Sequence, residues 1–180
     1  PLDVVKFSAA FGTWLQTNKN KKNLTIVVGR DARISGKMVN SLVCATLQGL
    51  GMNVIDLGLS TTPTVEIMVP ELNADGGIIL TASHNPKEWN ALKLLNEKGE
   101  FINSENGADV LKLAADESFN FAEVDDLGTY EERNDAFDIH IQQILDLPMV
   151  DAEAIKAKNY KIVLEAVNYK GGIEIQMLLE

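Results

Sequence analysis

Short, continuous apolar runs alternate along this chain with longer stretches of helical periodicity. The runs lie at 24–28 and 77–80, a third expected strand at 54–57 is interrupted by Asp56, and stretches with apolar residues at helical spacing lie at 4–15, 38–50 and about 63–69. A continuous β-branched run is typical of a strand buried on both faces of a sheet. Strands and helices that alternate with connections this short predict a layered α/β/α domain with a mostly parallel, mixed sheet.

The second half of the chain extends this pattern and then changes. It predicts a strand over 92–95, a helix over 104–115, an irregular acidic segment over 116–128 and a helix over 133–147 that carries a surface histidine, His140. Pro148 interrupts the chain, so we place a domain boundary there: 1–148 form a first domain, and 149–180 begin a second, similar one. We expect a short helix over 152–157 and a buried strand over 161–165 in it. The helix-like end without a stop signal predicts a fragment of a longer protein.

Charge and cysteine content narrow the function classes. Sixteen basic and 26 acidic side chains give a net charge of −10, which argues against a nucleic-acid backbone or an anionic membrane as partner. A small anionic ligand held by a few local cations is compatible with it. Cys44 is the only cysteine, which excludes an internal disulfide and fits a reducing compartment. No apolar run approaches the ~18 residues that cross a bilayer, so we expect a cytoplasmic protein.

Ligands of open α/β sheets gather at the carboxyl ends of the strands. Polar loops follow expected strands at 29–36, 58–62 and 81–90. In the third, Ser83, His84 and Asn85 bring a hydroxyl, an imidazole and an amide together just after a strand. Ser83 either meets a substrate or, with Asn85, satisfies backbone groups of a capped turn. In an extended segment His84 points away from Ser83, and no G-x-S-x-G elbow is present, so a Ser–His–Asp hydrolase is disfavoured.

The first polar loop concentrates positive charge. Two of the three arginines in the chain, Arg30 and Arg33, fall between Gly29 and Gly36. An arginine fork suits phosphate, but an internal salt bridge with Asp31 that only stiffens the loop is an equally good interpretation. Neither a Walker A loop nor a G-x-G-x-x-G motif occurs, so nucleotide binding is disfavoured. Cysteine and histidine also lack metal-ligand spacing. Lys93 is either a further cation for a ligand or a solvated strand lysine.

Two of these segments resemble a known family. Thr81-Ala82-Ser83-His84-Asn85-Pro86, followed by Asn90-Ala91-Leu92-Lys93, resembles the phosphoserine loop of the α-D-phosphohexomutases, which comprise phosphoglucomutase, phosphomannomutase and phosphoglucosamine mutase. The segment at 28–36 is similar to the G-R-D-x-R-x-S-G segment of that family, and the one at 164–168 resembles the first strand of its second domain. The resemblance covers almost the whole chain and implies a four-domain isomerase with a central active-site cleft, of which this chain holds domain one and the start of domain two.

The resemblance also implies an activity and roles for single residues. The family interconverts hexose 1-phosphate and 6-phosphate through a phosphoserine and a bisphosphorylated sugar. Ser83 would be the phosphorylated serine and would offer one phosphate oxygen to Mg²⁺. His84 and Lys93 match positions that contact the reacting phosphate or assist proton transfer. The positions that would support the phosphate loop or the substrate are Arg30, Asp31, Arg33, Asn85 and Asn90.

Other parts of the family pattern would lie outside this chain. An arginine-bearing glycine motif would precede Pro1, and the aspartate-rich metal loop, the sugar-reading loop and a last phosphate-binding loop would follow Glu180. We therefore expect the remaining domains of the same chain as partners, a phosphosugar as substrate, a sugar bisphosphate as activator and no turnover by residues 1–180 alone. Ala91 replaces a common glycine, which is tolerated if the backbone there needs no positive φ. A non-catalytic phosphosugar-binding module of the same fold is the alternative.

Overall fold

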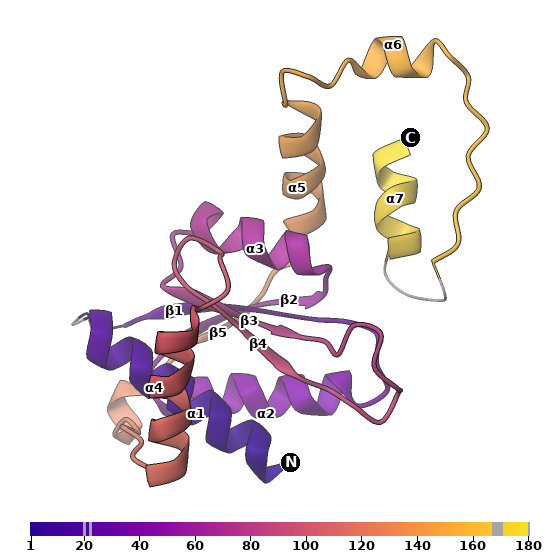
Figure 1. The fold of residues 1–180 in the computed structure, drawn as a ribbon. Coiled ribbons are helices and arrows are strands. Elements are labelled where there is room, and N and C mark those ends of the chain that lie inside the picture. The colour runs from indigo at the N-terminus through magenta and orange to yellow at the C-terminus, as the bar shows by residue number, and fades with distance from the viewer. Residues whose placement is uncertain (20, 22, 167–170, 180) are drawn as a thin grey trace.

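A five-stranded sheet forms the centre of the computed structural model, which describes residues 1–19, 21, 23–166 and 171–179. Its strands are β1 (Thr25–Arg30), β2 (Asn53–Leu59), β3 (Gly76–Leu80), β4 (Leu92–Leu95) and β5 (Tyr130–Glu132), in the order β4-β3-β1-β2-β5. β1 pairs in parallel with β2 and β3, β2 pairs in parallel with β5, and β4 runs antiparallel to β3. The expected mostly parallel, mixed sheet is confirmed (Figure 1).

Helices cover both faces of the sheet. α1 (Leu2–Lys19), α2 (Gly36–Gly49) and α4 (Ser104–Asp116) lie on one face, and α3 (Thr62–Glu71) and α5 (Ala136–Leu145) lie on the other (Figure 1). Neighbouring strand residues therefore pack in different layers: Ile78 belongs to the core under α1 and α2, and Ile79 to the core under α3. This double burial explains why β1 and β3 are continuous apolar runs.

The strand expectations were incomplete at the far edge of the sheet. β5 is a three-residue strand, Tyr-Glu-Glu, with all three side chains exposed. It contains no apolar run, so the sequence pattern did not predict it. Charged side chains are typical of short edge strands. The backbone N–H of Arg133 continues the pairing by donating to Asp56 O at 2.9 Å. α5 consequently begins at Ala136 rather than at 133, and the acidic segment before β5 holds one 3-10 turn, η1 (Val124–Asp126).

The predicted strand over 161–165 is wrong. These residues form no strand, all five are exposed, and Val163 is 98% exposed. A strand needs a neighbouring strand for its backbone groups, and none pairs with it in the part of the chain that the structure describes. The two helices here are α6 (Ala152–Lys156) and α7 (Gly171–Leu179), which lie beyond α5 and away from the sheet (Figure 1). The resembling segment at 164–168 lies partly outside the described residues.

His140 is not the surface residue that its helix predicted. It is half-buried on α5, and its Nδ1 lies 3.0 Å from the hydroxyl of Thr64 on α3. Burial lowers the pKa of His140. None of the helices in the described ranges has both the length and the apolar character that crossing a membrane requires.

Candidate active site

The segment after β3 folds into two consecutive turns at the carboxyl edge of the sheet. The Asn85 N–H donates to Ala82 O at 2.9 Å, and the Trp89 N–H donates to Pro86 O at 3.0 Å. Ser83 has a φ of +50°, and its N–H donates to Thr81 Oγ1 at 3.2 Å. The expectation of an extended segment at Ser83 and His84 is therefore wrong. A left-handed serine costs about 1–2 kcal/mol, so the surrounding structure must hold it in place.

The Arg33 side chain holds this serine loop, although it comes from the loop after β1. Arg33 is only 6% exposed. Its Nε donates to Asp31 Oδ2 at 3.2 Å, and its two terminal nitrogens donate to four main-chain carbonyls. The carbonyls belong to Ser83 at 2.9 Å, Asn85 at 2.8 Å, Pro86 at 2.7 Å and Trp89 at 2.9 Å. All five guanidinium donors are committed, so Arg33 is a structural clamp and has none left for a phosphate.

Two more contacts join the loop after β1 to β3 and its loop. The Asp31 N–H donates to Leu80 O at 3.0 Å, and the Asn90 amide donates to Ser35 Oγ at 3.3 Å. Within each loop, Asp31 Oδ1 accepts from the Arg33 N–H and Asn90 Oδ1 from the Ala91 N–H, both at 3.0 Å. Ala91 has no positive φ, so the alanine in place of glycine is accommodated. The two loops form one hydrogen-bonded unit.

The Ser83 hydroxyl is exposed and points to a lysine. Lys93 Nζ donates to Ser83 Oγ at 3.3 Å, and the same nitrogen lies 5.7 Å from the ring centroid of Phe101. Thr81 and Asn90, rather than Ser83, satisfy the backbone of the turns. Of the two interpretations of the serine, the capped turn is therefore not what the structure has.

The structure does not bring the other expected residues to the Ser83 hydroxyl. The His84 and Asn85 side chains are exposed; Asn85 takes part through its main-chain groups, and His84 has no side-chain hydrogen bond among the described residues. Arg30 donates to Asp31 O at 3.2 Å and lines a polar cavity of about 350 Å³ together with Lys37 and Asp56. Its support of the serine loop is thus indirect.

Comparisons with known proteins show the family of this chain. The family model described as "Phosphoglucomutase/phosphomannomutase, alpha/beta/alpha domain I" matches residues 1–121. The chain belongs to the phosphoglucomutase/phosphomannomutase family. A phosphoglucomutase/phosphomannomutase of Thermococcus kodakarensis is 36% identical over 99% of this chain and 38% of its own length. A phosphoglucosamine/phosphogalactosamine mutase of Sulfurisphaera tokodaii is 35% identical over 97% of this chain and 37% of its own.

A solved structure has the same fold. A crystal structure of a phosphoglucomutase/phosphomannomutase family protein from Burkholderia thailandensis aligns with 79% of this chain and 31% of that one, at 24% identity and a TM-score of 0.67. The curated relatives are much longer than this chain, which spans less than two fifths of either of the two named above.

The residues around Ser83 do not make a metal site by themselves. Within the described ranges, no group of three or more histidine, cysteine, aspartate or glutamate side chains lies close enough together to hold an ion. The charged side chain that contacts Ser83 is a cation, Lys93. The described residues therefore do not supply a set of side-chain ligands for the Mg²⁺ that the family resemblance implies.

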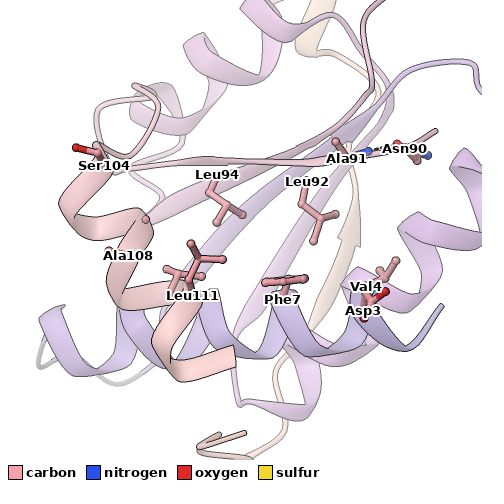
Figure 2. Close-up of a pocket in the computed structure, with 12 residues that line it drawn as sticks. Asp3, Val4, Phe7, Asn90, Ala91, Leu92, Leu94, Ser104, Ala108 and Leu111 are labelled. Carbon is pink, nitrogen blue, oxygen red and sulfur yellow. Dashed lines mark hydrogen bonds between the residues drawn. The ribbon is translucent and has the colours of Figure 1, made fainter. Parts of the chain in front are cut away.

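A cavity of about 650 Å³ lies on the other face of β4, between α1 and α4 (Figure 2). Figure 2 shows Leu92 and Leu94 pointing from β4 toward Phe7 and Leu111, while Asn90 lies at one end of the cavity. Apolar walls do not suit a phosphate group. Because side chains alternate along a strand, Lys93 lies on the opposite face, and this cavity is separate from the serine site.

Sequence reasoning missed Phe101. The β3–β4 pairing placed Lys93 near the serine loop, but Phe101 returns to Lys93 only through the tight turn at 96–99 and a bridge with Leu95. Gly99, with a φ of +77°, is the one sequence signal of that turn.

Proposed function

We propose that this chain carries the phosphoserine site of a phosphohexomutase, with Ser83 as the residue that accepts and returns a phosphoryl group. The observation that carries the proposal is the contact of the exposed Ser83 hydroxyl with Lys93, on a loop clamped by Arg33 at the carboxyl edge of the sheet. The name of the Thermococcus kodakarensis relative, phosphoglucomutase/phosphomannomutase, supports the same reaction class.

The proposed reaction has two balanced steps. Phosphoserine 83 transfers its phosphoryl group to the free hydroxyl of a hexose monophosphate: the Oγ–P bond breaks, a sugar O–P bond forms, and the sugar proton ends on Ser83 Oγ. The hexose bisphosphate then reverses its orientation in the site and returns its other phosphoryl group to Ser83. The serine proton passes to the released sugar oxygen. The net result interconverts hexose 1-phosphate and hexose 6-phosphate.

The residues near Ser83 suit this chemistry because phosphoryl transfer depends on positioning and on charge neutralisation. Lys93 supplies a positive charge at the oxygen that carries the phosphate. Arg33 and Asp31 fix the loop, and Asn90 joins it to the loop after β1. His84 is exposed and follows Ser83 in the chain; its contact with the phosphate or its help in proton transfer is part of the proposal.

The proposal needs groups that these 180 residues do not provide. A phosphate on Ser83 offers Mg²⁺ one oxygen, and the protein ligands would come from other segments, so no step here is assigned to the metal. We propose that 1–148 form the first domain of a longer enzyme, that 149–180 begin the next, and that 1–180 alone do not turn over. A cytoplasmic location, with no nucleic-acid or membrane partner, belongs to the same proposal.

The deciding test is Ser83→Ala in the full-length protein, with Ser41→Ala as control, because Ser41 is an exposed serine that donates only to Lys37 O. We expect Ser83→Ala to lose both mutase turnover, assayed against glucose, mannose and glucosamine 1-phosphates, and the phosphopeptide that mass spectrometry detects in the parent. The Ser41→Ala variant should keep both. Phosphosugar binding in the parent without turnover or phosphoserine would favour the non-catalytic module. Labelling of Ser83 by a fluorophosphonate would favour a hydrolase.

A further inference from the structure

Phe101 lies against the one cation that contacts Ser83 in the described residues. We propose that Phe101 is a positioning residue for Lys93: the phenyl ring of Phe101 holds the lysine ammonium at the Ser83 hydroxyl. This inference rests on the function proposed above. Lys93 Nζ lies 3.3 Å from Ser83 Oγ and 5.7 Å from the Phe101 ring centroid. An ammonium within about 6 Å of an aromatic centroid is attracted to the ring.

Lys93 needs such a contact because it lies on an edge strand. β3 is the one strand that pairs with β4 in the described residues, and on its other side β4 meets only the return of the chain at 101–102. Leu92 and Leu94 pack toward α1 and α4, so Lys93 extends from the other face, with Ile79 as its partner in β3. A lysine side chain has four rotatable carbon–carbon bonds, and an unrestrained one spends much of its time in solvent. Contact with the ring removes part of that freedom.

The position of Phe101 is itself fixed by the backbone. The Asn96 N–H donates to Glu100 O at 2.8 Å and closes the turn, Phe101 forms a bridge with Leu95, and the Ile102 N–H donates to Leu94 O at 3.1 Å. A Cβ on Gly99 would meet the main-chain oxygen of Glu66. The turn therefore rests directly on α3, and the Phe101 ring has a defined place beside Lys93.

Glu66 on α3 is the other group that responds to the charge of Lys93. It is half-buried, and burial raises its pKa while the charge of Lys93 opposes the rise. The ammonium itself is held by its contacts with the Phe101 ring and the Ser83 hydroxyl. In that position it neutralises charge on the phosphorylated serine oxygen.

The test compares Phe101→Leu with Phe101→Trp in the full-length protein. Leucine keeps apolar bulk without a π face, and tryptophan keeps the π face. We expect Phe101→Leu to lower kcat about two- to fivefold with KM unchanged, because an exposed cation–π contact is worth that much. Phe101→Trp should restore kcat. Phe121→Leu is the control, since Phe121 is also exposed and packs on Phe119, away from Lys93.

Lys93→Met separates this inference from the function on which it rests. If Lys93→Met leaves kcat unchanged, the role proposed for Lys93 in the reaction fails. If Lys93→Met lowers kcat while Phe101→Leu does not, the reaction proposal stands and the role of Phe101 is overturned. A loss in Phe101→Leu that tryptophan fails to restore, or an equal loss in Phe121→Leu, also overturns it, because the ring is then not the cause.

Discussion

The loops that follow β1 and β3 lie next to each other at one edge of the sheet, yet their polar groups point in opposite directions. In the loop after β1, Arg33 is 6% exposed and all its donors go to protein oxygens. In the loop after β3, the Ser83 hydroxyl is exposed and its contact in the described residues is a single lysine. The charged loop is the support, and the neutral hydroxyl is the group that stays exposed.

The difference follows from the cost of burying charge. A guanidinium taken out of water must find a partner for each donor, and only main-chain carbonyls of a tight loop supply four acceptors within one fork. The serine loop, which forms two turns, directs four main-chain carbonyls at Arg33. Arg33 and the serine loop therefore depend on each other, and Arg33 has no donor left for a phosphate.

Substitution of Arg33 is the strongest test of this contrast between the loops after β1 and β3. We expect Arg33→Met to lower the free energy of unfolding of the 180-residue chain by about 3–5 kcal/mol, since it leaves Asp31 and four carbonyls without their donor. Arg33→Lys should recover only part, because an ammonium has three donors and no planar fork. Urea unfolding followed by circular dichroism measures both.

Arg133→Met is the matched control. Arg133 Nε pairs with Asp135 Oδ1 at 2.7 Å, but Asp135 is exposed and Arg133 is partly exposed. Removing such a pair costs about 0–1 kcal/mol. Equal losses in the two variants would show that the Arg33 clamp is no stronger than a surface ion pair, and the contrast between the loops would not hold.

Asp31→Asn is expected to cost less, about 1–2 kcal/mol. The asparagine oxygen can still accept from the Arg33 N–H, but its amide nitrogen is a donor and cannot accept from Arg33 Nε, so that hydrogen bond is lost. The same urea measurement applies, with Asp135→Asn as control at the exposed pair. An Asp31→Asn loss as large as that of Arg33→Met would mean that the ion pair, rather than the four carbonyls, carries the clamp.

The left-handed backbone conformation of Ser83 is expected to lower the free energy of unfolding. Its φ is +50°, so Ser83→Gly should raise the free energy of unfolding by about 0.5–1 kcal/mol after the entropic cost of glycine. Ser83→Ala, which keeps a Cβ, should leave it unchanged. Destabilisation by Ser83→Gly would show that the left-handed residue is not strained, and that the clamp holds the loop without opposing any backbone preference.

The sequence predicted the parts of this structure whose causes are local. β1 and β3 came from continuous apolar runs, β2 and β4 from short apolar segments with one charged residue each, and the serine loop from its residue types after a strand. β5 could not be found, because a three-residue acidic strand is defined only by its pairing with β2. The segment over 161–165 has strand-forming residues but no paired neighbour among those described, so composition alone misjudged it.

The candidate site was predictable in its members but not in their roles. Ser83 and Lys93 were named, and the structure places them in contact. Whether Arg33 meets a ligand or stiffens a loop depends on carbonyls some fifty positions later in the chain, which residue spacing does not reveal. The same reason hid Phe101, because its contact with Lys93 depends on how one turn rests on α3.

The smallest expected effect tests whether the loop after β2 also points its polar groups inward. His140 Nδ1 lies 3.0 Å from Thr64 Oγ1, which lies 2.7 Å from Thr61 Oγ1 at the start of α3. Burial lowers the pKa of His140, so below about pH 6.5 the unfolded chain binds a proton more readily than the folded one. Stability is therefore full above that pH and falls as the pH drops toward the folded pKa.

Because His140 is only half-buried, the loss should amount to a few tenths of a kcal/mol. Urea midpoints at about pH 8 and about pH 5.5, compared between the parent and His140→Gln, isolate it from the carboxylates, which titrate in both. A smaller drop in the variant would place the β2 loop with the inward-facing loop after β1. An identical drop would mean that His140 titrates as freely as a surface histidine, and that the loop after β1 is alone in turning its polar groups into the protein.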